Sequence, residues 1–274
     1  MQTKVILEKQ DLTYLSWTKT RNSSGTAGSF LKSHSDLSGE RVYYKLSNYD
    51  AYKGIVGHES INELIVDRLL TIFGIKHLNY NLIHADILVD DRIHETYLCA
   101  STDFKKRDED KVALDAYYQI EREDSESPLD FCIHKGWAEY IWEMLVVDFL
   151  ILNRDRHGAN IEVLRNSSTK TFHLAPLFDH GLSLVFNCNN IETVHSFDVM
   201  EDKPVQCFVG SNSAKDNLKL IPKNSYPQLN PIQKSDYEII FSDLKTVLQQ
   251  TYIDKIWEML WRRWLFYENF CNQR

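Results

Sequence analysis

The sequence predicts an α+β fold in two parts, an N-terminal antiparallel sheet that contains one helix and a C-terminal region that is mainly helical. Three patterns indicate this order. β-forming segments with one amphipathic helix among them fill roughly the first hundred residues, an apolar helix is expected at 137–152, and helical periodicity returns at 237–270. The break is expected near Ala100 to Phe104, so that residues 1–101 and 102–274 would form two lobes beside a shared cleft.

The elements of the N-terminal part follow from β-forming runs and one helical period. Residues 40–46 are rich in Val and Tyr, which favours a strand, and residues 58–73 place apolar side chains at helical spacing just before Gly74. Asp90 and Asp91 mark a turn between two further strands. The expected strands are 12–20, 30–33, 40–46, 78–89 and 93–100.

The first half of the C-terminal part combines one apolar run with several polar ones. Residues 137–152 are almost entirely apolar, which predicts a buried helix, and a hairpin of two short strands is expected at 161–164 and 171–177. Residues 105–111 form a charged run that we interpret as a loop or the start of a helix. Residues 115–127 are polar and are interpreted as helical or mobile.

The second half of the C-terminal part gives weaker sequence signals. Residues 185–231 have no clear periodicity, and we expect them to include an activation segment and a substrate surface. Residues 237–270 are expected to form one or two helices. Trp257, Trp261 and Trp264 fall on one face of that helical period, and such an aromatic stripe indicates core packing more often than a binding platform.

Composition excludes several classes of protein. The chain has 274 residues, 43% of them apolar, and no apolar run approaches the roughly 20 residues of a membrane span. Its first residues lack the apolar stretch of a signal peptide, and its five cysteines include no Cys-x-x-Cys pair, which favours reduced thiols and a cytoplasmic location. The net charge of −8 argues against nonspecific nucleic-acid binding. We therefore expect neither a membrane nor a nucleic acid as a direct partner.

The most informative feature is a polar cluster that follows the apolar helix. Residues 153–160 read Asn-Arg-Asp-Arg-His-Gly-Ala-Asn, and Asp179 follows Asn160 after nineteen residues in the segment Leu-Ala-Pro-Leu-Phe-Asp-His-Gly. Phosphoryl transfer from ATP needs a carboxylate near the attacking hydroxyl and oxygen ligands that hold Mg²⁺. An Asp, a downstream Asn and a later Asp before Gly occur in this order in protein kinases. Asp155 is thus predicted as the catalytic carboxylate, and Asn160 and Asp179 as metal ligands.

A plainer interpretation of the same stretch is a polar turn, because Asp and Asn are common in turns. Its place between a buried helix and a hairpin favours a functional loop on a rigid scaffold. Arg154 and Arg156 flank Asp155, and they either steer a phosphate or substrate or pair with acidic neighbours such as Asp148. Sequence alone does not separate these alternatives.

A kinase also needs a lysine on a strand and an acidic residue on the next helix. Lys45 lies in the strand predicted at 40–46, and Glu63 lies on the following helix, so Lys45–Glu63 is the preferred pair. Glu59, one turn earlier, is the alternative acid. A solvated lysine on an edge strand is the plainer interpretation of Lys45, and Lys32 and Lys53 are competing lysines.

The phosphate cradle is predicted in a Ser- and Gly-rich turn, residues 23–29, where glycines let the backbone approach phosphates. The turn is not Gly-x-Gly-x-x-Gly, no Gly-Lys-Ser/Thr follows, and an ordinary hairpin loop is the alternative. Backbone groups of Ala100 and Ser101, between Cys99 and Asp103, are expected to contact adenine. The predicted cradle residues are Ser24, Gly25, Thr26, Ala27, Gly28 and Ser29.

Three histidines lie near the motif but lack the spacing of a metal site. His157, His173 and His180 do not form a helical His-x-x-x-His pair, so we expect structural or supporting roles for them. His157 lies inside the polar cluster and is included among the residues predicted to contact the cofactor.

The polar cluster resembles the Asn-x-Asp-x-His-x-x-Asn catalytic loop of HipA-like serine/threonine kinases, and residues 174–181 resemble the metal-binding segment of that family. Asn62-Glu63 and the helix that runs to Gly74 look like its regulatory helix. The Asp-Arg-His-x-x-Asn core is also shared with phosphatidylinositol 3- and 4-kinases. The resemblance implies a two-lobed protein-kinase-like fold.

The same resemblance implies an activity, cofactors and partners. The cofactors would be ATP and Mg²⁺, with Lys45 as the ATP lysine, Asp155 as general base, and Asn160 and Asp179 as Mg²⁺ ligands. The substrate would be a Ser or Thr hydroxyl of a protein, and the family's autophosphorylation of glycine-loop serines points to those at 23, 24 and 29.

Compared with longer HipA proteins, this chain has only a short segment before its first strands, so it looks like the compact, single-unit members. A cognate regulatory or antitoxin protein, as in toxin–antitoxin systems, is the partner that the family suggests. Two other functions stay open on the same fold: a phosphoinositide or small-molecule kinase, and a nucleotide-binding pseudokinase.

Overall fold

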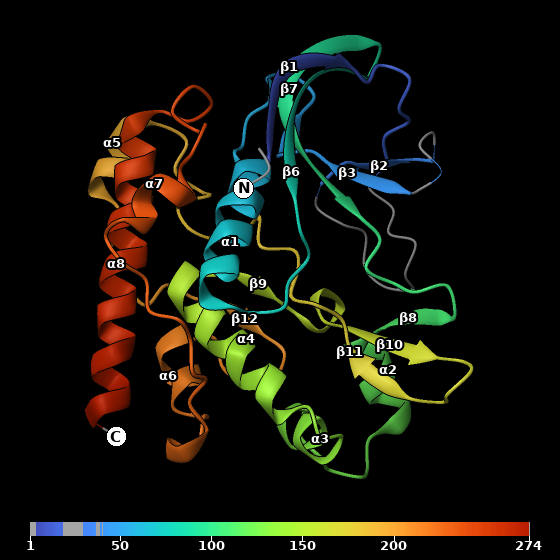
Figure 1. Cartoon of the computed structure of the whole chain (residues 1–274), viewed down its shortest axis with the longest axis vertical. Helices are drawn as coiled ribbons and strands as arrows, with labels where there is room; N and C mark the ends of the chain where they lie inside the picture. The colour runs from blue at the N-terminus through green and yellow to red at the C-terminus, as the bar shows by residue number, and fades with distance from the viewer. Residues whose placement is uncertain (1–3, 19–29, 37–38, 40, 274) are drawn as a thin grey trace.

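The computed structural model describes residues 4–18, 30–36, 39 and 41–273. It has a sheet-rich N-terminal region and a helical C-terminal region, which confirms the predicted mixed fold class (Figure 1). The helix predicted at 58–73 and the apolar helix predicted at 137–152 are both present, as α1 (Glu59–Phe73) and α4 (Ala138–Ile151).

The N-terminal region is built on a five-stranded sheet with the order β1-β6-β7-β3-β2. β1 runs parallel to β6, whereas the other neighbours are antiparallel, so the predicted antiparallel sheet includes one parallel pair. A parallel neighbour is feasible because the long connection between β1 and β6 includes a crossover helix, α1. The strands are β1 (Val5–Asp11), β2 (Lys32–Ser35), β3 (Val42–Lys45), β6 (Asn81–Val89) and β7 (Arg92–Thr102).

The first strand is earlier in the chain than predicted. The segment expected as a strand at 12–20 is mostly irregular where it is described, although Thr18 bridges to Lys32. Leu12 and Leu15 are buried against the sheet, in a core cluster with Leu46 and Leu98. Their apolar character reflects packing from a loop. A short hairpin, β4 (Tyr49–Asp50) and β5 (Gly54–Ile55), was not expected.

The turn between β6 and β7 follows directly from its residues. Asp90 and Asp91 have φ of 49° and 58°. Two left-handed residues in a two-residue loop match the right-handed twist of the strands they join, and Asp accepts this conformation better than most residues. The predicted hairpin is confirmed, with Val89 opposite Arg92.

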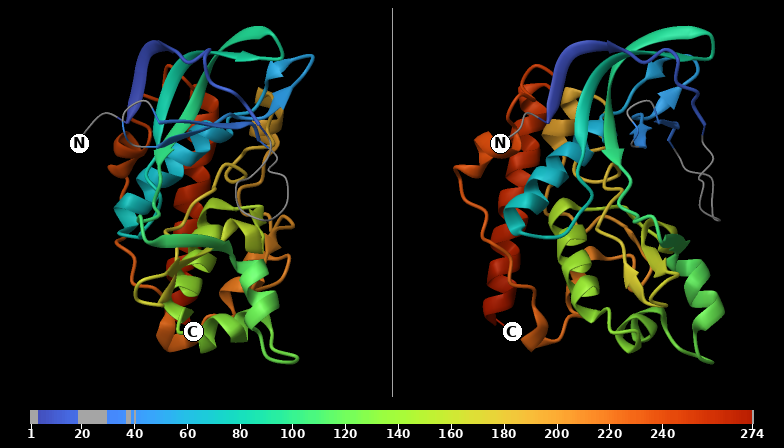
Figure 2. Two further views of the ribbon diagram at one scale, coloured as in Figure 1. Left: turned by 90° about the vertical axis from the view of Figure 1, so that its right-hand side faces the viewer. Right: turned by 45° about the vertical axis from the view of Figure 1, so that its right-hand side comes forward.

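Helix α1 lies between the sheet and the C-terminal helices (Figure 2). It ends at Gly74, whose φ of 78° is the left-handed conformation of a glycine helix terminus. Leu64, Ile65 and Leu69 are fully buried in a cluster that continues into α4 and into α8 (Gln250–Gln273). This helix is therefore anchored in the main core of the molecule.

The C-terminal region forms several helices and small sheets. Its helices include α2 (Leu114–Glu121), α3 (Pro128–His134), α5 (Ile191–Ser196), α6 (Ala214–Leu218), α7 (Asp236–Ile240) and the 3₁₀ turns η1 (Gly158–Asn160) and η2 (Lys223–Ser225). Its strands are β8 (Glu109–Ala113), β9 (Asp155–Arg156), β10 (Glu162–Asn166), β11 (Phe172–Leu174) and β12 (Gln206–Cys207). The predicted hairpin is β10–β11, and β8 joins it as a third strand, so part of the charged run is a strand.

The final segment forms two helices, α7 and α8, within the prediction of one or two. Trp264 is buried and stacks on Phe73 of α1, with ring centroids 5.4 Å apart. Trp257 and Trp261 pack against the same core. The aromatic stripe is thus core packing, as predicted.

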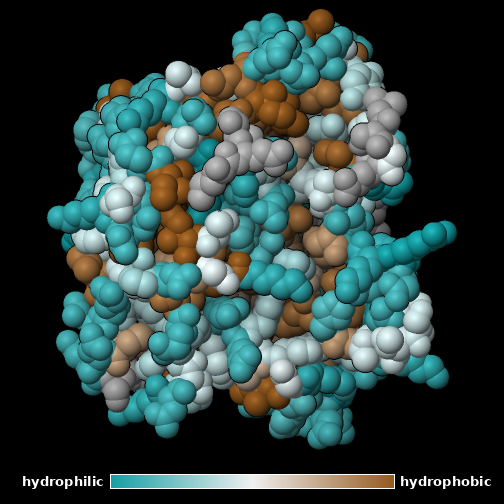
Figure 3. Space-filling view, in the orientation of Figure 1, coloured by the Kyte–Doolittle hydropathy of each residue, from teal (hydrophilic) through white to brown (hydrophobic). Residues whose placement is uncertain are grey.

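Hydrophilic side chains cover most of the face drawn in Figure 3, and hydrophobic ones show mainly in its upper and central parts. Among the residues that the structure describes, no helix has both the length and the apolar character that a membrane span requires.

Candidate active site

The structure brings Lys45 together with two carboxylates from distant parts of the chain. Lys45 ends strand β3, and its Nζ lies 2.8 Å from Glu63 Oε1 and 2.5 Å from Asp179 Oδ1. Glu63 is fully buried on α1, and Asp179 follows β11. Strand β3, helix α1 and the segment predicted to bind the metal therefore meet at one ammonium group.

Electrostatics keep that ammonium charged. Burial disfavours the charge of Lys45, but the adjacent Asp179 and Glu63 carboxylates outweigh it and raise the pKa of Lys45 above its ordinary value. A fixed, permanently charged lysine is what the α- and β-phosphates of a nucleotide require.

The competing residues lie elsewhere. Glu59 Oε2 accepts a hydrogen bond from the Asn48 N–H at 3.1 Å, and burial raises the pKa of Glu59. Lys32 is the register partner of Lys45 on the neighbouring strand, and Lys53 lies in the exposed turn between β4 and β5. The Lys45 ammonium donates to Glu63 on α1, while the Lys45 carbonyl accepts a hydrogen bond from Ser60 of the same helix.

The loop of Asp155 begins where α4 ends. Leu152 has φ of 51° and terminates the helix. Asn153 Nδ2 donates to Asp148 Oδ1 at 2.8 Å, and Asn153 Oδ1 accepts the Asp155 N–H at 3.2 Å. Asn160 Nδ2 donates to the Asp155 carbonyl at 2.7 Å. Asp155 is thus fixed on both sides of its backbone, while a quarter of its side chain is exposed (25%).

Arg156 connects the two predicted metal ligands. Its guanidinium is buried and pairs with Asp148 through Nε at 2.9 Å and Nη2 at 2.9 Å. Its Nη1 donates to the carbonyls of Asn160 and Phe178, both at 3.0 Å. Because Phe178 directly precedes Asp179, one nitrogen joins the Asn160 backbone to the Asp179 segment. Arg154, by contrast, donates from Nε to the Pro204 carbonyl.

Asp179 has an uncommon backbone conformation that its neighbours stabilise. Its φ is 60°, its N–H donates to Tyr80 Oη at 3.4 Å, and the next N–H, of His180, donates to Glu63 Oε2 at 2.8 Å. Left-handed backbone at a non-glycine residue persists where surrounding contacts determine it, often at functional sites. Tyr80 was not predicted as a site residue, because its only sequence signal is its place in the strand expected at 78–89.

Each of the three histidines near the motif lies close to a carboxylate. His180 is buried, and burial together with the nearby charge of Arg156 holds its pKa well below the usual range. His173 Nε2 lies 3.6 Å from Glu109 Oε1, on the β10–β11 hairpin. His157 Nε2 lies 3.6 Å from Asp155 Oδ1, next to the predicted catalytic carboxylate.

The donor set fits Mg²⁺ bound together with phosphates. In the described ranges, no group of three or more His, Cys, Asp or Glu side chains could hold a metal ion. Mg²⁺ is usually bound through one or two carboxylates, with phosphate oxygens and water completing its shell. Asp179 provides a carboxylate and Asn160 an amide oxygen, which suits that mode of binding.

The residues predicted to contact the nucleotide are only partly described. Ser24, Gly25, Thr26, Ala27, Gly28 and Ser29 lie outside the described residues. Ala100 and Ser101 lie at the end of β7, where pairing with β6 stops at Ala100 but pairing with β3 continues to Thr102. Beyond them, Asp103 pairs with Lys111 at 2.6 Å, and Phe104 lies 5.7 Å from Phe178 between ring centroids.

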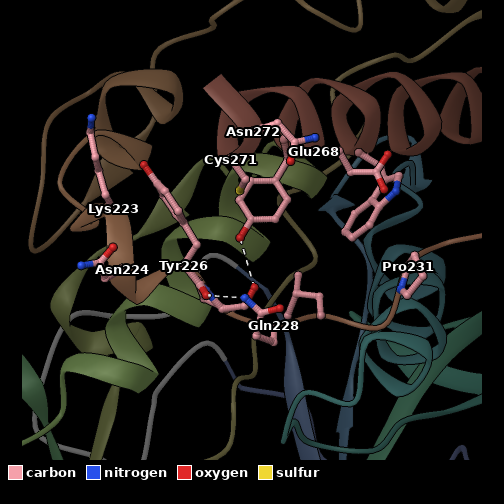
Figure 4. Close-up of a pocket in the computed structure, with 12 residues that line it drawn as sticks. Lys223, Asn224, Tyr226, Gln228, Pro231, Glu268, Cys271 and Asn272 are labelled. Atoms are coloured by element: carbon pink, nitrogen blue, oxygen red, sulfur yellow. Dashed lines mark hydrogen bonds between the residues drawn. The ribbon is translucent and has the colours of Figure 1, made fainter. Parts of the chain in front are cut away.

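A separate hollow of about 550 Å³ lies between α8 and residues 223–231 (Figure 4). Tyr226, Glu268 and Asn272 are among its lining residues, and the Tyr267 hydroxyl donates to the Pro227 carbonyl beside it. None of the residues predicted for catalysis or cofactor binding lines this hollow.

The chain is similar to known proteins in one short segment of its sequence and in its fold. No family model matches the chain. A segment of 45 residues, 16% of the chain, is 44% identical to the serine/threonine-protein kinase CtkA of Helicobacter pylori, and it spans only 14% of the length of that protein.

Two solved structures share the fold. The crystal structure of the Helicobacter pylori proinflammatory kinase CtkA has a TM-score of 0.60 at 16% identity, over 93% of this chain and 94% of the other. HipA from a Shewanella oneidensis MR-1 complex with HipB and operator DNA has a TM-score of 0.55 at 14% identity, over 93% of this chain and 67% of the other. The chain thus has the fold of HipA-like serine/threonine kinases, and the predicted resemblance to them is confirmed.

Proposed function

We propose that the chain is an ATP-dependent serine/threonine protein kinase of the HipA-like type. The observation that carries the proposal is the contact of Lys45 with both Glu63 and Asp179, at 2.8 and 2.5 Å. Protein kinases need a strand lysine paired with a helix glutamate, and a metal-binding Asp beside them, and this arrangement supports such a site.

Each residue then has a distinct role. Lys45 would bind the α- and β-phosphates, and Glu63 would fix its position. Asn160 and Asp179 would hold Mg²⁺, and Asp155 would accept the proton of the attacking hydroxyl. When bound, Mg²⁺–ATP supplies the γ-phosphoryl group and neutralises charge on the phosphates.

A protein substrate would bind beside Asp155, along residues 185–231, for which the sequence indicated no clear secondary structure. Strand β12 pairs with β9 in parallel, with Gln206 opposite Asp155 and Cys207 opposite Arg156. Arg263 of α8 anchors the same segment, because its buried guanidinium donates to the carbonyls of Val199 and Glu201. An ordered surface thus lies next to the proposed base.

The partner and the location are part of the same proposal. The HipA neighbour was solved with HipB and its operator DNA. For this chain we propose a cognate regulatory or antitoxin protein, and a cytoplasmic location. The serines at 23, 24 and 29 are the proposed autophosphorylation sites.

Two substitutions separate binding from chemistry. Asp155→Asn should reduce turnover by at least about a hundredfold while ATP affinity changes little, because the base contacts the hydroxyl and not the nucleotide. Asp179→Asn should instead weaken Mg²⁺-dependent ATP binding. Asp91→Asn, in the exposed β6–β7 turn, is the matched control. Full turnover in Asp155→Asn would refute the assignment of the base.

A further inference from the structure

The segment after Asp179 is attached to helix α1 by a second residue besides Glu63. Asn62 is completely buried, and its Nδ2 donates to the Gly181 carbonyl at 3.0 Å and to the Ser183 carbonyl at 3.1 Å. Both amide hydrogens of Asn62 are therefore used on one short stretch of backbone. Nothing in the catalytic scheme above requires this contact.

Asn62 and Glu63 act on the same stretch from adjacent positions of α1. Glu63 accepts the His180 N–H at 2.8 Å and also binds Lys45. Together the two side chains fix one N–H and two carbonyls between Asp179 and Ser183. A rotation or shift of α1 would thus move Lys45 and Asp179 with it.

The backbone of this stretch needs such support. Asp179 has φ of 60° and Leu184 has φ of 59°, so a left-handed residue stands at each end. Non-glycine residues pay a conformational penalty there, and the conformation persists only where neighbouring contacts determine it.

Close packing shows that the stretch lies directly on α1. A Cβ atom added at Gly181 would lie 3.1 Å from Glu59 Cβ and 3.3 Å from Lys45 Nζ. A side chain at this position would require the neighbouring atoms to shift by a few tenths of an ångström. The close approach of residue 181 to α1 therefore favours a glycine at this position.

We propose that Asn62 is a positioning residue for Asp179. Its carboxamide fixes residues 181–183 on α1, and this orients the Asp179 carboxylate toward Lys45 and toward the Mg²⁺ of the nucleotide. The inference rests on the proposed function for the identity of the metal, but the attachment itself is a property of the protein without ligands.

The test combines a measurement on the ligand-free protein with one on the nucleotide complex. Asn62→Ala removes both donors, and the loss of two hydrogen bonds should accelerate amide exchange at residues 179–184 by about tenfold in hydrogen-exchange mass spectrometry. In titrations with Mg²⁺ and a non-hydrolysable ATP analogue, the Mg²⁺ concentration for half-saturation should rise by roughly fivefold or more. Asn62→Ser, which keeps one donor, should fall between wild type and Asn62→Ala, and it serves as the test variant if the alanine variant does not fold.

Arg68→Met is the matched control on the same helix. Arg68 Nη1 donates to the carbonyls of Ile240 and Ser242, on the side of α1 away from Asp179. Its loss should lower the melting temperature without changing exchange at 179–184 or the Mg²⁺ dependence.

Two results would overturn the inference: unchanged exchange at 179–184 in the Asn62 variants, or an equal effect of Arg68→Met. If the wild-type protein binds no Mg²⁺–nucleotide, the proposed function fails, and so does the proposal that Asp179 is a metal ligand. The exchange experiment would still decide whether Asn62 attaches residues 181–183 to α1.

Discussion

The two arginines beside Asp155 should differ sharply when each is replaced by methionine. Methionine keeps much of the aliphatic length of arginine and removes its charge and its donors. Arg156 is 1% exposed and binds Asp148, Asn160 and Phe178. Arg154 is partly exposed, and its Nε binds the Pro204 carbonyl.

The size of the effect follows from what Arg156→Met leaves behind. Asp148 would remain largely buried, with Asn153 as its one side-chain donor among the residues that the structure describes, and the carbonyls of Asn160 and Phe178 would each lose a hydrogen bond from Arg156. Breaking one side of a buried ion pair typically costs about 3–5 kcal/mol. At about 2–4 °C per kcal/mol for a chain of this size, the melting temperature should fall by roughly 10 °C.

Urea unfolding followed by circular dichroism, with Arg154→Met as the control, measures this difference. The control should lose less than about 1 kcal/mol, because surface substitutions rarely cost more. Replacing both members of the pair, as Asp148→Leu with Arg156→Met, should recover part of the loss, since no unpaired charge remains. Equal losses in Arg154→Met and Arg156→Met would refute the assignment of Arg156 as the buried support of the two proposed metal ligands, Asn160 and Asp179.

Two further substitutions test the packing around the site. A Cβ atom at Gly158 would lie 2.6 Å from Asp115 Cβ and 3.0 Å from its backbone nitrogen, so Gly158→Ala should cost about 1–3 kcal/mol and lower turnover; wild-type stability in denaturant would contradict this. Burial lowers the pKa of His58 from 6.5 to about 4, so the unfolded state binds more protons between these values and stability is lost as pH falls through them. His58→Phe keeps an aromatic ring against Tyr252, and it should remove about 3 kcal/mol of the stability that the wild type loses on acidification. The part of the pH dependence due to His180 should remain. An unchanged plot of unfolding free energy against pH would exclude His58 as a cause of the acid destabilisation.

Sequence patterns predicted the elements whose signals are local. The β6–β7 hairpin was readable because Asp90 and Asp91 form its turn, and α4 because its residues are nearly all apolar. Strand β1 was missed because it is an edge strand in which Val5 alone is fully buried, so no alternation of apolar residues marks it. β8 was interpreted as a loop or helix start because its pairing with β10, fifty residues away, has no local signal.

In the candidate site, too, features with a local sequence signal could be predicted and those that depend on distant residues could not. Lys45 and Glu63 could be paired from the sequence because one lies on a strand and the other on the next helix. The different environments of Arg154 and Arg156 could not be predicted, because both flank Asp155 and burial is decided by α4 and by the Phe178 carbonyl. Tyr80 could not be found either, since it reaches Asp179 from a loop about a hundred residues earlier.

The proposed activity is transfer of the γ-phosphate of ATP to protein hydroxyls at Asp155. The most direct measurement incubates the wild type and Asp155→Asn with Mg²⁺ and ATP, with and without candidate protein substrates, and maps phosphate by intact mass and peptide sequencing. We expect phosphate on Ser or Thr with the wild type and none with Asp155→Asn. Equal phosphate with both proteins, or none with a wild type that binds ATP, would contradict it, and the second result would favour a pseudokinase or a kinase of lipids or small molecules.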